Sequence, residues 1–143
     1  MHFRLIRPAA ADFPAHLKLL KPAFEGSDDP KGEFEFVRDL LEDKRGSFYL
    51  LTGKGIKLWF VSRRLDGRFH IVAMTGRGLV QAASHIIERA TNCGYRAISY
   101  HTYRKGMRRI LGRFGFEQTE QVREFDGKAE TVHQLELVGG AHG

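Results

Sequence analysis

A β-rich run over residues 68–74 leads directly into Thr75-Gly76-Arg77-Gly78, and apolar residues at helical spacing follow from Leu79 to Ala90. The pattern predicts a strand, a glycine turn and an amphipathic helix in immediate succession. Such a junction gathers free backbone N–H groups and the positive end of a helix dipole at one point. It therefore favours an anion, typically a diphosphate, whose approach to the backbone a Cβ would block. Taken alone, the same turn is also common as a plain structural connection.

The chain around this junction predicts a mixed α/β sheet. Three β-rich runs, at 47–52, 56–63 and 68–74, are separated only by tight turns, which implies an antiparallel meander. The helix after Gly78 has to cross over to the next strand, 97–102, so we expect that strand to pair in parallel with 68–74. The full order is β-α-α-β-β-β-α-β-α-β-β, and its other elements are a strand at 3–6, a helix begun by Asp12, helices at 30–42 and 105–114, and a hairpin of 117–125 with 129–138.

No linker, repeat or low-complexity segment interrupts this order, so we expect one domain over residues 1–138 and a flexible tail at 139–143. Cys93 is the only cysteine, which excludes an intramolecular disulfide and indicates a reducing compartment. We expect Cys93 to be a small buried residue. No signal-peptide pattern or membrane-length apolar run is found, so a cytoplasmic protein without a membrane partner is predicted. The seven histidines show no ligand spacing with a carboxylate or a cysteine, and no metal site is predicted.

The formal net charge is +6, and cations gather in the helix predicted at 105–114. They are Arg104, Lys105, Arg108, Arg109 and Arg113. Like charges four residues apart repel and weaken a helix slightly. The stripe suits phosphate groups, either of a nucleotide-containing cofactor or of nucleic acid, and a solvated helix face is an equal interpretation. No nucleic-acid reading motif is present, so nucleic acid is the less favoured partner.

Residues 74–117 resemble the GNAT (Gcn5-related) acyl-CoA N-acyltransferase superfamily. Thr75 to Gln81 looks like the cofactor motif of that family, Gln/Arg-x-x-Gly-x-Gly/Ala at a strand-to-helix turn. Gly94 followed by a strand, and a short helix that ends in Gly115-Phe116, are similar to its next two landmarks. The order of elements agrees over residues 3–138, so the resemblance implies the GNAT fold.

The resemblance further implies an enzyme that binds acetyl-CoA or another acyl-CoA, on whose thioester an amine acts by direct attack. The pantetheine would run along Ala73–Thr75, where backbone N–H groups would polarise the carbonyl. The diphosphate would lie on Arg77–Val80, and the start of the basic helix would reach the 3′-phosphate. The residues expected to bind the cofactor are Ala73, Met74, Thr75, Gly76, Arg77, Gly78, Leu79, Val80, Arg104 and Lys105.

The match to the family is incomplete at positions that carry chemistry. Depending on the register, Ala73 or Thr75 stands where the family prefers Gln or Arg. Arg104 takes the place of a frequent Asn, and Leu111 takes the place of the Tyr that commonly protonates the departing thiolate. The usual general acid is therefore missing.

Four side chains are candidates for the proton transfers. His70 stands where the histone acetyltransferase branch carries a Glu, and an imidazole is a competent base at neutral pH. Tyr103, Tyr100 or His101, at the end of the strand 97–102, could replace the missing acid. A packing or surface role is an equally good interpretation of each.

Three functions stay open on the sequence alone. The first is an N-acyltransferase whose acceptor is a small amine, a protein amine or a nucleobase. The second is a catalytically degenerate binding or structural protein on the same fold, similar to short GNAT-like proteins of tailed bacteriophages, which would act in a virion or in the host cytoplasm. The third is a nucleic-acid-binding or nucleic-acid-modifying protein that uses the basic helix. A homodimer is compatible with each of them.

Overall fold

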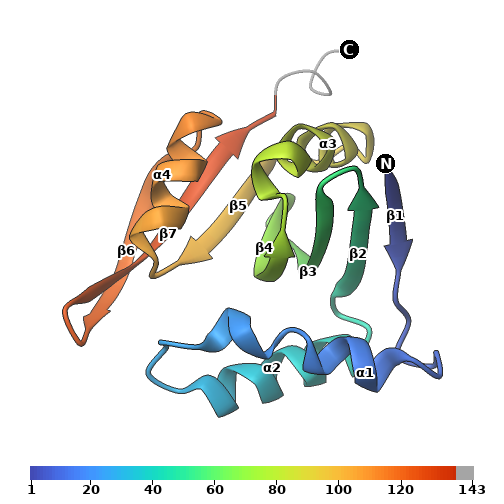
Figure 1. Ribbon diagram of the computed structural model, residues 1–143. Helices are drawn as coiled ribbons and strands as arrows, with labels where there is room; N and C mark the ends of the chain where they lie inside the picture. The colour runs from blue at the N-terminus through green and yellow to red at the C-terminus, as the bar shows by residue number, and fades with distance from the viewer. Residues whose placement is uncertain (138–143) are drawn as a thin grey trace. The chain divides into compact units, whose positions relative to one another are not determined.

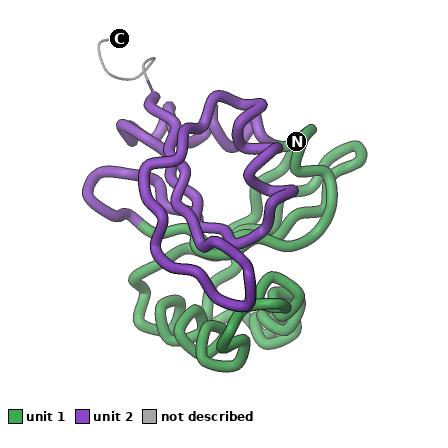
Figure 2. Tube along the Cα trace, turned by 90° about the vertical axis from the view of Figure 1, so that its left-hand side faces the viewer, with its two compact units in different colours: residues 1–63, 72–82 green, residues 64–71, 83–143 purple. Residues whose placement is uncertain are grey.

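The computed structural model describes residues 1–137, so the tail expected at 139–143 and the predicted strand end at Val138 lie outside the described residues. Seven strands are hydrogen-bonded in the order β1-β2-β3-β4-β5-β7-β6 (Figure 1). The contacts divide the chain into two compact units (Figure 2). Unit 1 holds residues 1–63 and 72–82, and unit 2 holds residues 64–71 and the described chain from Ala83 onward. The boundary falls inside β4, and a single domain over 1–138 stays a prediction.

Unit 1 combines antiparallel strands with the first helices of the chain. Its strands are β1 (His2–Leu5), β2 (Ser47–Gly53) and most of β3 (Ile56–Leu65), and β2 pairs antiparallel with both of the others. Its helical elements are α1 (Phe13–Lys18), the 3-10 turn η1 (Lys21–Phe24) and α2 (Pro30–Glu42). Apolar side chains of these elements form one core, which includes Phe13, Leu20, Phe24, Val37, Leu40, Phe48, Val61 and Ala73.

Helix α2 begins and ends as its sequence predicts. The Asp29 side chain accepts a hydrogen bond of 3.0 Å from the Gly32 N–H, which satisfies one of the free donors of the first turn. Pro30 occupies the first helical position, where its missing N–H costs nothing. Val37, Leu40 and Leu41 recur at helical spacing and are buried.

Helix α1 forms, but Asp12 does not cap it with its side chain. Asp12 stands at the N-cap position, yet its carboxylate accepts hydrogen bonds from Arg4 (2.6 Å) and His16 (3.2 Å) instead. The Arg4 guanidinium holds the pKa of Asp12 below its usual value. On the other side of the His16 ring, Trp59 Nε1–H donates to Nδ1 over 3.0 Å. The chain of polar contacts therefore ties β1, α1 and β3 together within unit 1.

We expect Trp59→Phe to lower the free energy of unfolding by about 1 kcal/mol, the usual net contribution of one such hydrogen bond. The aromatic ring is retained, while Nδ1 of a part-buried His16 loses its donor. Urea denaturation of Trp59→Phe, His16→Gln and the double variant gives the coupling free energy. Additive effects of the two substitutions would show that this hydrogen bond does not contribute.

Unit 2 contains the parallel pairing that the sequence predicts. Arg68–Ile71, the first part of β4 (Arg68–Arg77), pairs in parallel with Ala97–Tyr100 of β5 (Ala97–Thr102). Strand β7 (Lys128–Glu136) pairs antiparallel with β5 on one side and with β6 (Glu117–Phe125) on the other. Helix α3 (Leu79–Asn92) forms the crossover, and α4 (Lys105–Arg113) precedes the hairpin.

Two expectations about local structure are wrong. Cys93 is exposed, because the buried stripe of α3 ends at Ala90 and the chain turns at Gly94, whose φ is +85°. Strand β4 extends to Arg77 rather than stopping at Met74. Gly76, with a φ of +122°, allows the strand to continue through a backbone conformation that L side chains rarely adopt.

Candidate functional site

The junction between β4 and α3 has the backbone geometry of an anion site. Gly78 precedes the helix with a φ of +90°, and its carbonyl accepts the bond from Ala82 N–H (2.8 Å). The N–H groups of Leu79, Val80 and Gln81 therefore have no acceptor within the helix. No acidic residue lies in the first turn of α3 to neutralise the positive end of its dipole. This end of the helix favours a bound anion over an empty state.

Unit 1 contains the eight contiguous residues that the sequence predicts for the cofactor, Ala73 to Val80. Ala73 and Met74 are buried, and Ala73 belongs to the core, so a ligand beside this part of β4 has only backbone groups to contact. Arg77 and Val80 are exposed, which leaves the turn accessible to a diphosphate.

Within unit 2, the parallel register of β4 with β5 runs from Arg68 with Ala97 to Ile71 with Tyr100. The part of β4 that belongs to unit 1, residues 72–77, is an extended strand that leads into the glycine turn. Peptide groups of an extended strand are suited to bind the amide groups of an extended ligand such as a pantetheine.

Gly76 and Gly78 are required by packing inside the protein. The sequence-based prediction, that a Cβ there would block an approaching phosphate, gives the wrong reason for these glycines. A Cβ on Gly76 would clash with the carbonyl oxygen of Lys57, and a Cβ on Gly78 would lie 2.5 Å from the carbonyl oxygen of Gly55. These contacts are with the start of β3 and the turn before it. A side chain at either position would thus meet the protein's own backbone and not an approaching phosphate.

Substitutions at these two glycines are consequently expected to affect folding before they affect binding. Gly78→Ala combines a positive φ with the close backbone contact, and we expect it to lower the free energy of unfolding by about 1–3 kcal/mol. Thermal and urea unfolding would measure the loss. An unchanged stability would contradict the observed approach of Gly55 to this turn.

His70, one predicted base, lies in the first part of β4 and is 9% exposed. Its Nδ1 is 2.7 Å from Oγ of Ser99, a fully buried hydroxyl at the matching position of β5. A buried imidazole with a short hydrogen bond to a neighbouring strand is well placed to stabilise the pairing of β4 with β5. Its environment gives little access to a substrate.

His101, the second histidine of interest, lies beside the carboxylate of Glu130, which no local sequence pattern connects to it. Its Nε2 is buried, has no hydrogen-bond partner in the described part of the chain, and lies 3.4 Å from Oε2 of Glu130, while the side chain as a whole is 36% exposed. The Glu130 side chain is only 6% exposed, and the same oxygen accepts a 3.1 Å hydrogen bond from Arg123 Nε. A partly exposed imidazole beside a buried carboxylate is suited to proton transfer.

The two tyrosines differ in environment. Tyr100 is buried, and burial raises the pKa of its hydroxyl well above the ordinary value, so it stays neutral. The Tyr103 ring packs against Phe125 at 5.8 Å between centroids, with the cationic groups of Arg104 and Lys128 within 6 Å of it. Leu111, at the position of the expected acid, is buried and apolar.

The two predicted phosphate ligands outside the turn, Arg104 and Lys105, belong to unit 2. Both are exposed, at the N-cap and the first residue of α4. The Arg104 N–H donates to Oγ1 of Thr102 over 3.0 Å, which anchors the start of this helix to the end of β5.

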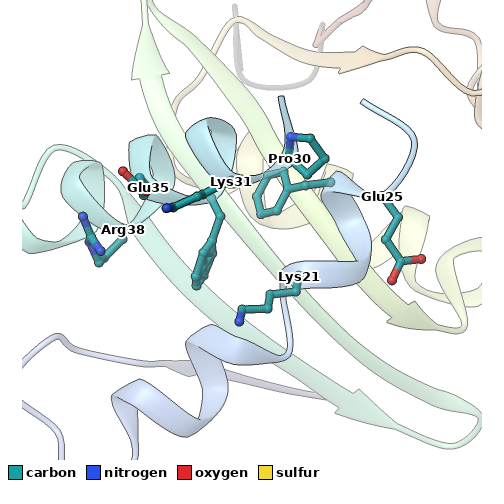
Figure 3. A pocket seen from close by; sticks show the side chains of 8 residues that line it. Lys21, Glu25, Pro30, Lys31, Glu35 and Arg38 are labelled. Atoms are coloured by element: carbon teal, nitrogen blue, oxygen red, sulfur yellow. The ribbon is translucent and has the colours of Figure 1, made fainter. Parts of the chain in front are cut away.

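Unit 1 also contains two cavities, and neither is lined by the β4–α3 turn. One of about 520 Å³ lies between η1 and α2, where Phe24, Pro30 and Phe34 form its apolar lining and charged side chains surround it (Figure 3). The other, of about 670 Å³, is lined by residues around 5–9 and 44–48. Within residues 1–137, no group of three metal-ligating side chains is found, and no helix there is long and apolar enough to cross a bilayer.

Comparison with known proteins identifies the fold of this chain through solved structures and not through sequence. No protein-family model and no curated protein sequence matches the chain. The structure is similar to a Bacillus subtilis acetyltransferase solved in complex with CoA, with a TM-score of 0.66, 18% identity, and coverage of 96% of this chain and 99% of that one. The structure is also similar to the ribosomal-protein-S18-alanine N-acetyltransferase of Escherichia coli, with a TM-score of 0.64 and 14% identity. The match covers 95% of this chain and 94% of that one.

A Salmonella typhimurium acetyltransferase candidate solved with its cofactor acetyl-CoA is a third similar structure, with a TM-score of 0.59, 17% identity, and coverage of 96% and 95%. At these identities the likeness establishes the architecture. The chain has the GNAT acetyltransferase fold, and the predicted fold class is confirmed.

Proposed function

We propose that this chain is an acyl-CoA-dependent N-acyltransferase that transfers an acetyl group from acetyl-CoA to an amine by direct attack. The observation that carries the proposal is the β4–α3 junction, where an extended strand runs through a glycine turn into a helix start with free N–H groups and no acidic residue. Two solved structures with this fold contain CoA or acetyl-CoA, which supports the same class of cofactor here.

The residues of unit 1 would hold the cofactor without side-chain chemistry. Backbone groups of Ala73–Thr75 would bind the pantetheine and polarise the thioester carbonyl, and the diphosphate would lie on Arg77–Val80, where the N–H groups of Leu79 and Val80 would bind it. Acetyl-CoA supplies an activated acyl group with a thiolate as the leaving group. In the transfer, the amine nitrogen forms a bond to the carbonyl carbon, the C–S bond breaks, and the amine loses a proton.

We propose His101 as the group that takes this proton, with Glu130 as its positioning residue. His101 has both a buried carboxylate partner and an exposed portion, whereas His70 is buried and bonded to Ser99. The thiolate would receive its proton from Tyr103 or from water, because Leu111 has no proton to give. The acceptor class stays open between a small amine, a protein amine and a nucleobase.

A second candidate, a cofactor-binding protein without transferase activity, is favoured by one observation. Leu111 is buried and apolar at the position where the family commonly carries its acid. Calorimetric titration with acetyl-CoA, followed by release of free thiol in the presence of an amine panel, separates the two. Binding with amine-dependent thiol release supports the transferase, and binding without any release supports the second candidate.

The start of α4 gives a further test of the cofactor. The resemblance implies that Arg104 contacts the 3′-phosphate, and losing a charge-assisted hydrogen bond costs about 1.5–3 kcal/mol. We expect Arg104→Ala to weaken CoA binding roughly ten- to a hundred-fold and to leave dephospho-CoA less affected. Arg113→Ala, which removes an exposed cation from the far end of the same helix, is the matched control. Equal losses for both nucleotides would exclude Arg104 as a phosphate ligand.

A further inference from the structure

Helix α4 carries most of the net charge of the protein. Residues 104–113 contain five cations and no acidic residue, against a net charge of +6 for the whole chain. Lys105, Arg109 and Arg113, four residues apart, are all exposed, and we call these three the α4 cationic row. Because like charges at this spacing destabilise a helix, the row opposes the stability of the helix that carries it.

The α4 cationic row also lacks the ion pairs that other cations of the chain form. Arg4, Arg38 and Arg45 each lie within 4 Å of a carboxylate oxygen. In the described part of the chain, no ion pair involves any residue of the row or the neighbouring Arg108. The charges of this helix are thus available to an external anion.

The apolar side of α4 is already used, which limits the kind of partner. Leu111 is buried, and Met107 and Ile110 are half-buried. Figure 1 shows α4 alongside β7 and β6, and the charge of Arg108, after burial, is a cause of the lowered pKa of His133 on β7. A helix without a free apolar face cannot insert into a lipid interface, so a membrane surface is disfavoured.

An aromatic pair lies at the start of the same helix. Tyr103 and Phe125 are half-buried, and their rings pack edge-on at 5.8 Å. Arg104 and Lys128 lie 5.6 Å and 5.9 Å from the Tyr103 ring. Cations that follow a backbone, beside aromatic rings that accept bases, are the two components of single-strand binding surfaces. An acidic peptide would use the cations but not the rings.

We propose that the α4 cationic row and the Tyr103–Phe125 pair form a sequence-independent binding surface for single-stranded nucleic acid. The phosphates lie along Lys105, Arg109 and Arg113, and bases stack at the Tyr103 end. The surface lies wholly within unit 2 and does not depend on acyl transfer.

Fluorescence anisotropy with a labelled twelve-nucleotide oligo(dT), titrated at several KCl concentrations, tests the proposal on the full-length protein. The double variant Arg109→Ala/Arg113→Ala is expected to reduce the slope of log K against log salt by about 1.4, because each lost single-strand contact contributes about 0.7. The matched control Lys18→Ala/Lys54→Ala removes two exposed cations of unit 1 and leaves the slope unchanged. Thermal unfolding checks that the α4 variant is folded, which we expect because the substitutions remove like-charge repulsion from the helix.

Tyr103→Leu separates nucleic acid from other polyanions. We expect it to weaken oligo(dT) about five- to a hundred-fold, as for the loss of one stacked base, and to leave heparin binding unchanged. No oligo(dT) binding at low salt, equal losses in the control double variant, or polyglutamate binding as tight as oligo(dT) would each overturn the proposal. We expect Arg109→Ala/Arg113→Ala to keep the wild-type affinity for acetyl-CoA. The nucleic-acid proposal and the proposed acyl transfer can therefore fail independently of each other.

Discussion

Val80→Glu is expected to weaken acetyl-CoA binding by roughly a hundred-fold or more. Val80 is the second residue of α3 and is 41% exposed, so a longer side chain meets no packed neighbour. A carboxylate about 5 Å from a bound phosphate repels it by about 3 kcal/mol at an effective dielectric constant of about 20. The same carboxylate in the first turn stabilises the helix itself by about 0.3–1 kcal/mol. Binding and stability are therefore expected to change in opposite directions.

Val80→Gln is the matched control, because it has the shape of the glutamate without its charge. We expect the Gln variant to keep its acetyl-CoA affinity within a few-fold of wild type. Calorimetry gives the affinities, and thermal unfolding confirms that both variants are folded. If the Glu variant binds acetyl-CoA as tightly as wild type, the diphosphate is not at this helix start.

His101→Gln is expected to lower the rate of acetyl transfer by about 10²–10⁴, the usual contribution of a general base, with acetyl-CoA affinity unchanged. The carboxylate of Glu130 lies 3.4 Å from the imidazole and does not itself take the proton in this proposal, so Glu130→Gln is expected to lower the rate less. Added imidazole is expected to restore part of the rate to His101→Gly, a recovery that a purely structural histidine would not show.

The other histidine distinguishes the alternatives. We expect His70→Gln to reduce stability through the loss of the Ser99 hydrogen bond while keeping most of the transfer rate per folded molecule. A large loss of rate in His70→Gln, joined to an unaffected His101→Gln, would return the role of base to His70.

Turn and cap residues made much of the architecture predictable. Helix α2 and strands β5 and β6 have the predicted bounds. Asp29-Pro30 marks the start of α2, Asp126-Gly127 marks the end of β6, and Gly94 ends α3 shortly before β5 begins. The parallel pairing of β4 with β5 follows from a helical crossover between two strands. Turn and cap residues act within short segments, and the crossover follows from the order of elements, so both can be predicted from a single sequence.

Tertiary register was not predictable in the same way. His101 and Glu130 are 29 positions apart and meet because Thr102 pairs with Thr131, a register that no local pattern specifies. The reason for glycine at 76 and 78 could likewise not be predicted from the sequence, because it depends on contacts with the backbone of β3 and the turn before it. The position of Asp12 predicts a helix cap, but its carboxylate accepts hydrogen bonds from Arg4 and His16 in place of the free N–H groups of the helix.

Calorimetric titration of acetyl-CoA into the wild-type protein tests whether the β4–α3 junction binds this cofactor. Because the junction is a single site, we expect saturable binding of one acetyl-CoA per chain, with a dissociation constant of roughly 1 µM to 1 mM, the usual range of enzyme substrates. The heat should be lost in Val80→Glu and retained in Val80→Gln. Absence of binding by a folded wild-type protein at acetyl-CoA concentrations of about 1 mM would rule out an acetyl-CoA site at this junction and with it the proposed acyl transfer.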